Sequence, residues 1–252
     1  MKRKVYEQLL EWKNQEHHKP LLLNGVRQCG KTYVLKEFGR REFDSLAYVS
    51  CDRNVNLQAI YSGDFDVARI IQGLSALTGV DIIPGKTLIF LDEVQAFPQA
   101  LEALKYFCED APEYHIAVAG SLLGVALHAG VSFPVGKVQT LRLFPMDFEE
   151  FLMAMGEEQL LKLMHSHDYE LMNAFHEKLK DLLRQYYYVG GMPEVVKAFV
   201  ENKLLNQVRS LQNEILSNYA SDFSKHAPSQ EVPRIDMVWQ SILGQLSKEN
   251  KK

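Results

Sequence analysis

The stretch LLLNGVRQCGKTYVL, Leu21 to Leu35, decides the fold of this chain. An apolar run breaks abruptly into Gly-Val-Arg-Gln-Cys-Gly-Lys-Thr, after which a helical pattern resumes. The break fits the spacing G-x-x-x-x-G-K-[ST], whose glycines let the backbone curl so that successive N–H groups point inward at phosphate oxygens. The stretch therefore predicts a phosphate-binding loop between a strand and a helix.

Several residues of this loop are expected to bind a nucleotide. The helix that starts at Lys31 directs the positive end of its dipole at an anion. Lys31 is expected to bridge the β- and γ-phosphates, and the hydroxyl of Thr32 to ligate Mg²⁺. A chance match has odds on the order of 1% at average residue usage, so we favour the functional interpretation. The candidate nucleotide-binding residues are Gly25, Val26, Arg27, Gln28, Cys29, Gly30, Lys31, Thr32 and Tyr33.

A second motif, TLIFLDE at residues 87–93, ends an apolar strand in two carboxylates. Ligands of open parallel sheets bind at the carboxyl ends of the strands, where this pair is expected. Asp92 is expected to hold the Mg²⁺, directly or through water, and Glu93 to act as general base or to position the attacking water. A solvated strand end is the ordinary alternative, but the upstream loop favours a site. Because binding needs only the aspartate, Glu93 favours hydrolysis over passive binding.

Composition and charge exclude several classes of protein. With 46% hydrophobic and 24% charged residues over 252 positions, the chain has the makeup of a globular protein and not of a disordered one. The formal net charge of −4 gives no overall electrostatic argument for binding nucleic acid or a membrane. The three cysteines form no C-x-x-C pair, which fits a reducing compartment. No apolar run approaches the ~20 residues that span a bilayer, so we expect a cytoplasmic protein without a membrane partner.

Apolar runs and helical patterns alternate over the first part of the chain. Strands are expected at residues 21–24, 46–50, 88–91, 116–119 and 138–143, with helices between them at 31–41, 66–77 and 99–109. Continuously apolar runs suit a sheet buried on both faces, and the alternation suits parallel crossovers. We therefore expect an α/β fold of the P-loop nucleotide-hydrolase kind, with a three-layer α/β/α core around a parallel sheet.

After LFPMDFEEFL, residues 143–152, only helices are expected. Apolar stripes predict helices over 169–188 and 204–219 and a further one from about 233, and VGGMPE at 189–194 is expected to break the helical run. Pro145 is the expected boundary between a nucleotide-binding core of residues 1–145 and an all-helical lid of residues 146–252. In the N-terminal helix, the candidates to contact the nucleotide base are Tyr6, Leu9, Leu10 and Trp12.

The motifs LLLNGVRQCGKT, LIFLDEVQAFP, IAVAGSLLGVAL and LFPMDFEEFL together resemble the AAA-like ATPases of bacteria and archaea that carry a C-terminal domain of unknown function. YYYVGGMPEVVKAF and ILSNYASDFSK look like the start of that domain, so the chain is expected to be truncated relative to its relatives. The resemblance implies ATP as the nucleotide. It also implies that the phosphate-loop strand is central in the sheet, flanked by the strand that carries Asp92.

The resemblance implies two further positions around the γ-phosphate. Ser121 is expected where AAA-like proteins place a catalytic polar sensor, although its hydroxyl would equally suit a cap for a helix over 122–127; both interpretations remain open. Family members usually carry a Gly-Arg pair where this chain has Gly136-Lys137. A lysine lacks the bidentate fork of arginine, which weakens any arginine-like role there. Arg142 lies close by in the sequence, but a surface arginine on a strand is the commoner explanation.

Three functions are compatible with these motifs. The leading one is an ATP-binding, Mg²⁺-dependent ATPase that couples hydrolysis to movement of the helical region. The second is a nucleotide-gated switch or scaffold with negligible turnover alone. The third is a DNA-handling ATPase that acts through a missing C-terminal domain. The expected partners are ATP and ADP, a protein partner or a second copy of the chain, and nucleic acid only through that missing domain.

Overall fold

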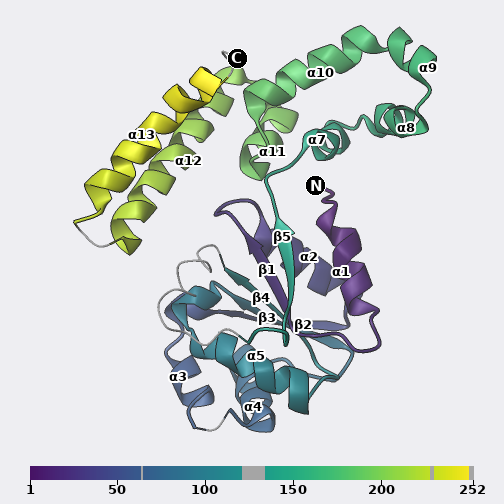
Figure 1. The fold of residues 1–252 in the computed structure, drawn as a ribbon. Coiled ribbons are helices and arrows are strands. Elements are labelled where there is room, and N and C mark those ends of the chain that lie inside the picture. Colours follow the sequence, from purple (N-terminus) through teal and green to yellow (C-terminus); the bar gives the residue numbers. More distant parts are fainter. Residues whose placement is uncertain (64, 121–133, 228–229, 250–252) are drawn as a thin grey trace. The chain divides into compact units, whose positions relative to one another are not determined.

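A computed structural model describes residues 1–63, 65–120, 134–227 and 230–249 (Figure 1). The chain divides by its internal contacts into two units, Met1–Pro193 and Glu194–Lys252. All strands of the described residues lie in the first unit, before residue 144, and the described part of the second unit is helical. A functional division into a core of residues 1–145 and a lid of residues 146–252 stays a prediction.

A five-stranded parallel sheet forms the centre of the first unit (Figure 1). Its strands are β1 (Leu21–Gly25), β2 (Ser45–Ser50), β3 (Thr87–Asp92), β4 (His115–Gly120) and β5 (Gln139–Leu143). Every pair of neighbouring strands is parallel, in the order β2-β3-β4-β1-β5. The five strands and the parallel sheet that the sequence predicted are therefore confirmed.

The strand order implied by the family resemblance is wrong. β1 is not central, and it is flanked by β4 and β5 instead of the strand that carries Asp92. β4 lies between β1 and β3, because Ala117 pairs with Leu21 on one side and with Phe90 on the other. All six residues of β3 and all six of β4 are buried. Both strands thus have the continuous apolar pattern of central strands, and that pattern does not distinguish which of them is next to β1.

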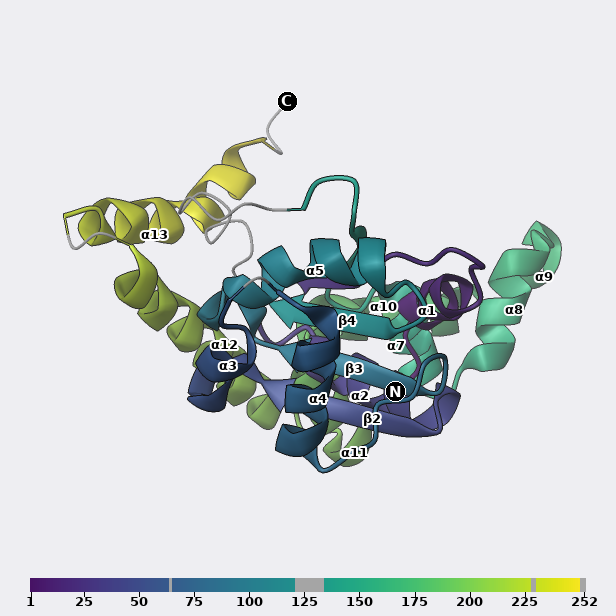
Figure 2. The same ribbon diagram turned by 90° about the horizontal axis from the view of Figure 1, so that it is seen from below.

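Helices cover both faces of the sheet (Figure 2). They are α1 (Val5–Lys13), α2 (Lys31–Glu42), α3 (Asn56–Ile60), α4 (Val67–Thr78) and α5 (Gln99–Asp110), with 3₁₀ turns η1 (Cys51–Arg53) and η2 (Val94–Ala96). α1 and α2 share one apolar core with Leu21 and Leu23, whereas α3, α4 and α5 share the other with Leu22. Because successive strand residues face opposite sides, both faces of the sheet are buried. This is the three-layer α/β/α core that the sequence predicted.

The described residues after β5 form only helices, as predicted. In the first unit these are α7 (Phe148–Ala154), α8 (Glu158–Ser166), α9 (Tyr169–Ala174) and α10 (His176–Val189). The second unit comprises α11 (Pro193–Asn202, which begins at the boundary), α12 (Leu205–His226) and α13 (Val232–Glu249). The single helix predicted over 169–188 is wrong, because the chain breaks at Phe175, whose N–H donates to Met172 in a tightened last turn of α9. The apolar stripe continues across this break and so conceals it.

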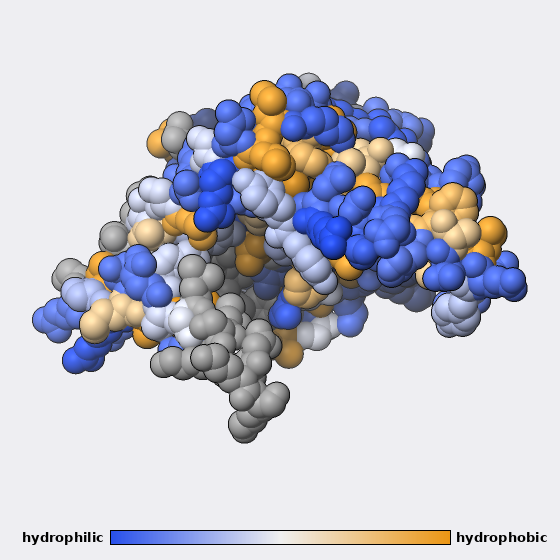
Figure 3. All heavy atoms as spheres, turned by 90° about the horizontal axis from the view of Figure 1, so that it is seen from above, coloured by the Kyte–Doolittle hydropathy of each residue, from blue (hydrophilic) through white to orange (hydrophobic). Residues whose placement is uncertain are grey.

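Hydrophobic side chains are interspersed among hydrophilic ones on the surface seen from above (Figure 3). Among the side chains that the structure describes on α12 and α13, the exposed large apolar ones are Leu205, Leu216, Met237, Val238 and Ile242. Among the helices that the structure describes, none combines the length and the apolar character needed to cross a bilayer.

A stacked histidine pair lies at the amino end of the sheet, opposite the edge where the phosphate loop begins. The rings of His18 and His115 are 3.7 Å apart at their centroids, and the ring of Trp12 meets both edge-on. Nε2 of His115 lies 3.2 Å from the carbonyl oxygen of Lys13, while both Nδ1 atoms are buried without a hydrogen-bond partner among the described residues. Burial lowers the pKa of His18 and, with the charge of His18, lowers the pKa of His115 to about 4.

Acid is expected to destabilise the first unit through this pair. Burial favours the neutral rings, so their folded pKa values lie below the ordinary value of 6.5. The contribution of the neutral histidine pair to the free energy of unfolding is therefore fully present above pH 6.5, and it is lost as the pH falls toward 4. Lowering the pH from about 7.5 to about 5 is expected to reduce the free energy of unfolding by about 2 kcal/mol, measured by urea unfolding.

His17 provides a matched control, because it is exposed and adjacent to His18. His17→Gln should keep the pH dependence of the unfolding free energy, whereas His115→Phe should flatten it. An equally steep pH dependence in His115→Phe would show that the acid sensitivity arises elsewhere.

Candidate functional site

The predicted site residues meet at the carboxyl edge of the sheet. β1 ends at Gly25, and β3 ends at Asp92. Because the strands are parallel, their carboxyl ends lie at the same edge, with Asn24 paired to Gly120 and Leu91 to Val118. Ser121 follows β4 directly, but it lies outside the described residues. The structure thus brings the phosphate loop and the Asp92-Glu93 pair to one edge.

The loop leads directly into the N-terminus of α2. The N–H of Val34 makes the first backbone hydrogen bond of the helix, to Gly30 O at 3.0 Å. The preceding N–H groups therefore lie at the open end of the helix, where partial positive charge gathers. The N-cap residue, Gly30, has a φ of 95° and no side chain to cover this end. Such an end is suited to bind a phosphate group.

Gly25 is required by a close backbone contact. A Cβ atom at this position would lie 2.3 Å from the carbonyl oxygen of Leu143 and 3.0 Å from Sγ of Cys29. The backbone of β5 thus approaches the start of the loop more closely than any side chain would allow. This contact gives the first glycine of the motif a steric reason that is independent of ligand binding.

Lys31 folds back over the loop. Its Nζ donates to Gly25 O at 2.8 Å and to Val26 O at 2.9 Å, and the residue is only 7% exposed. Burial lowers the pKa of Lys31, while the negative charges of Glu93 and Asp92 act in the opposite direction. The ammonium group is therefore held at the loop by two carbonyl oxygens, which phosphate oxygens can replace.

Asp92 is a buried carboxylate at the end of β3, 4% exposed. Its Oδ1 accepts the N–H of Glu93 at 3.1 Å, and its Oδ2 accepts the hydroxyl of Tyr48 at 3.3 Å. Burial raises the pKa of Tyr48, and the charge of Asp92 adds to this effect, so the tyrosine is a donor to the aspartate. The carboxylate of Asp92 and the half-buried hydroxyl of Thr32 are hard oxygen donors of the kind that Mg²⁺ binds.

Glu93 adopts a backbone conformation that is unusual for a residue with a side chain. Its φ of 51° and ψ of 43° are left-handed, and residues held this way cluster at functional sites. Its carboxylate accepts a hydrogen bond from the side-chain amide of Gln95. Oε1 of Gln95 is itself buried without a hydrogen-bond partner among the described residues. Gln95 therefore restrains the direction of the Glu93 side chain.

The remaining loop residues differ in exposure. Val26 and Tyr33 are exposed large apolar residues, and Arg27 is also exposed. Cys29 is fully buried, and burial raises the pKa of its thiol, so the sulfur is packed as a small apolar group. Oε1 of Gln28 is buried and has no hydrogen-bond partner in the part of the chain that the structure describes.

The N-terminal helix packs its apolar side chains into the core. Leu9 and Trp12 are fully buried. Leu10 packs against the same core, and the ring of Tyr6 meets Phe38 of α2 edge-on. The hypothesis that Leu9 and Trp12 contact the base is wrong, because both side chains are fully buried between α2 and the sheet. For the half-buried Tyr6 and Leu10 it stays a prediction.

The two basic candidates near β5 have partners of their own. Lys137 Nζ lies 3.0 Å from Oε1 of Glu109 on α5. The guanidinium carbon of Arg142 lies 5.9 Å from the ring centroid of Phe144. Lys137 is thus paired with a carboxylate, which weakens its candidacy as a charge donor to the phosphate loop.

Sequence reasoning missed three residues around this edge: Arg3, Tyr48 and Gln95. Arg3 contacts the loop at the carbonyl oxygen of Cys29. The basic start of the chain, MKRK, was the only signal for Arg3, and it reads equally well as a helix start. Tyr48 was hidden because its contact with Asp92 follows from the pairing of β2 with β3.

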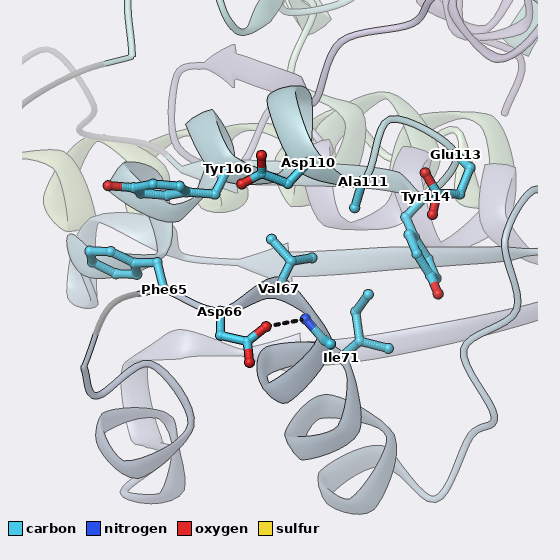
Figure 4. Close-up of a pocket in the computed structure, with 10 residues that line it drawn as sticks. Phe65, Asp66, Val67, Ile71, Tyr106, Asp110, Ala111, Glu113 and Tyr114 are labelled. Atoms are coloured by element: carbon cyan, nitrogen blue, oxygen red, sulfur yellow. Dashed lines mark hydrogen bonds between the residues drawn. The ribbon is translucent and has the colours of Figure 1, made fainter.

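A separate pocket of about 460 Å³ lies between α4 and α5 (Figure 4). The rings of Phe65 and Tyr106 stack at one end of it, with centroids 5.4 Å apart. Asp66 accepts the N–H of Ala68 and caps α4. None of the residues that line this pocket belongs to the phosphate loop or to the Asp92-Glu93 pair. The pocket is therefore distinct from the site at the sheet edge.

Comparisons with known proteins bear on the family and the fold of the chain. A family model described as an AAA domain matches residues 17–152, and one described as a domain of unknown function (DUF8612) matches residues 180–252. A Walker-type ATPase of Pyrococcus abyssi is similar in structure, with a TM-score of 0.56 and 14% identity over 90% of this chain and 77% of that one. A chain from a structure of Drosophila ORC bound to DNA has a TM-score of 0.43 and 14% identity, over 84% of this chain and 66% of that one. No curated protein matches.

Gly25→Ala is expected to disrupt the loop, because its methyl group would lie 2.3 Å from a backbone oxygen that cannot move freely. We expect the free energy of unfolding to fall by about 1–3 kcal/mol in urea titrations. Gly244→Ala on α13 is the control, since a Cβ there meets nothing within 4 Å. It should leave stability unchanged or raise it by up to about 1 kcal/mol. A Gly25→Ala protein as stable as the parent would refute the close contact.

Proposed function

Since the chain belongs to the AAA-domain family, whose model matches more than half of it, we propose that it is an ATP-binding, Mg²⁺-dependent ATPase. One observation carries the proposal. Lys31 is buried at the open N-terminus of α2, on the same sheet edge as the Asp92-Glu93 pair. A phosphate cradle next to a metal-binding carboxylate and a second carboxylate is the arrangement that phosphoryl transfer to water requires.

The residues of the loop would bind the triphosphate. Backbone N–H groups over residues 25–33 would cradle the phosphates, and Lys31 would exchange its bonds to Gly25 and Val26 for the β- and γ-phosphate oxygens. Thr32 and Asp92 would hold Mg²⁺. Bound Mg²⁺ would neutralise part of the negative charge that builds up on the phosphate oxygens.

Glu93 would act on the attacking water. Its carboxylate would accept a proton from the water or orient it in line with the γ-phosphorus. The hydrogen bond from Gln95 and the left-handed backbone support this role, because both restrict where the carboxylate points. Ser121 remains a proposed γ-phosphate sensor, with capping of the following helix as the alternative.

A nucleotide-gated switch with negligible turnover alone is the second candidate. The ion pair of Lys137 with Glu109 favours it, because this lysine then supplies no positive charge to the γ-phosphate. A protein partner or a second copy of the chain would provide that charge. Turnover by the purified chain alone distinguishes the two candidates.

Lys31→Ala is expected to weaken binding of Mg²⁺-ATP by about 100-fold or more, because it removes the cation that contacts two phosphates. Glu93→Gln is expected to bind Mg²⁺-ATP like the parent but to lower turnover by about 10²–10⁴-fold. Calorimetric titration measures binding, and release of inorganic phosphate measures turnover.

Lys86→Ala is the matched control, since Lys86 is exposed in a turn on the opposite edge of the sheet. It should leave binding and turnover unchanged. If Glu93→Gln hydrolyses ATP as fast as the parent, the base assignment is wrong. If the parent and Lys31→Ala bind equally, the nucleotide site is wrong.

A further inference from the structure

The side chain of Arg3 is buried against the phosphate loop. Its Nη1 donates to the carbonyl oxygen of Cys29 in the loop at 2.9 Å, and its Nη2 donates to the carbonyl oxygen of Phe144 after β5 at 2.6 Å. Its Nε lies 3.1 Å from Oε1 of Glu150 in the first turn of α7, and the two side chains are 5% and 6% exposed. One buried cation thus joins the loop, the end of the sheet and a helix.

The bond from Arg3 to Cys29 fixes the direction of the next backbone donor. In a trans peptide unit the C=O and the following N–H point to opposite sides. Because the carbonyl of Cys29 points at Arg3, the N–H of Gly30 points away from it. A hydrogen bond at the carbonyl also polarises the peptide unit and strengthens its N–H as a donor. Arg3 therefore orients a donor at the N-terminus of α2 without itself being one of the expected phosphate ligands.

Glu150 anchors the other end of this connection. Its Oε1 accepts the N–H of Lys4 at 2.7 Å. Its Oε2 accepts the N–H of Asp147 at 3.3 Å while Asp147 Oδ1 accepts the N–H of Glu150 at 2.8 Å, a capping box that begins α7. Removal of the cation from a buried ion pair strongly destabilises the fold, because the carboxylate charge is left uncompensated. The position of the first turn of α7 therefore depends on Arg3.

The segment between β5 and α7 also holds the end of α10. Met146 N–H donates to Gly191 O at 2.6 Å, and Met146 O accepts the hydroxyl of Tyr186 at 2.9 Å. A Cβ at Gly191 would lie 2.1 Å from Met146 O, so the two backbones are in direct contact. Displacement of residues 144–147 would consequently shift both α7 and α10.

We propose that Arg3 is a positioning residue that couples nucleotide binding at the phosphate loop to the docking of α7. The proposal rests on the proposed nucleotide site and names its regulation. A bound triphosphate fixes the peptide unit between Cys29 and Gly30, and Arg3 transmits that restraint to Glu150. Coupling of this kind is reciprocal, so a change at Glu150 in α7 must alter nucleotide affinity.

The experiment measures binding of Mg²⁺ with a nonhydrolysable ATP analogue to the full chain. Arg3→Lys keeps the charge but cannot reach three partners, and Glu150→Gln keeps an acceptor but removes the ion pair. Each is expected to weaken binding about tenfold, the size of an ordinary coupling between two sites. The double variant should bind the analogue no more weakly than the single variants, because both changes break the same connection. Hydrogen exchange over residues 148–154 should slow with the analogue in the parent but not in Arg3→Lys.

Arg41→Lys is the matched control, because Arg41 also pairs through Nε with a glutamate, Glu37 at 2.6 Å, but on the exposed side of α2. It should bind the analogue like the parent. A merely structural role would lower the thermal midpoint of Arg3→Lys and leave affinity and ligand-induced protection unchanged, which would overturn the proposal. Glu150→Gln tests the same coupling if Arg3→Lys does not fold. Failure of the parent itself to bind would overturn the proposed function, and the coupling with it.

Discussion

The ammonium group of Lys31 is buried, and the structure around it must supply acceptors for its charge. The carbonyl oxygens of Gly25 and Val26 do so, which ties the first residue of α2 to the end of β1. This tie requires a tight loop, and Gly25 at the start of the loop lies against Leu143, its pairing partner in β5. The phosphate loop, the pairing of β1 with β5 and the start of α2 are thus parts of one arrangement.

The two edges of the parallel sheet have different chemistry. The amino edge is closed by aromatic rings and by the neutral His18 and His115 pair. The carboxyl edge carries the open helix end, the buried carboxylate of Asp92 and the strained Glu93. Aromatic packing thus closes the first edge, while the second gathers charged and polar groups. At this second edge the guanidinium of Arg3 contacts the loop at Cys29 and forms a buried ion pair with Glu150 of α7.

Much of the fold was predictable from the sequence, because its signals are local. The five strands are short apolar runs. Lys31 and Thr32 lie within one motif, in which steric and electrostatic requirements explain each residue type. Strand order was not predictable, since β3 and β4 are both continuously apolar and periodicity does not distinguish neighbours. The contacts of Arg3 with Cys29 and of Tyr48 with Asp92 join residues distant in sequence, and no local pattern marks them. The break at Phe175 was concealed by an apolar stripe that runs across it.

The most direct measurement is a crystal structure of Glu93→Gln with ATP and Mn²⁺ in place of Mg²⁺. The anomalous signal of Mn²⁺ should lie between the hydroxyl of Thr32 and the carboxylate of Asp92. Nζ of Lys31 should have left Gly25 and Val26 for the β- and γ-phosphate oxygens, with the phosphates against the N-terminus of α2. A nucleotide bound elsewhere, or a lysine that keeps both carbonyl partners with ATP present, would contradict a phosphate-binding role for this loop.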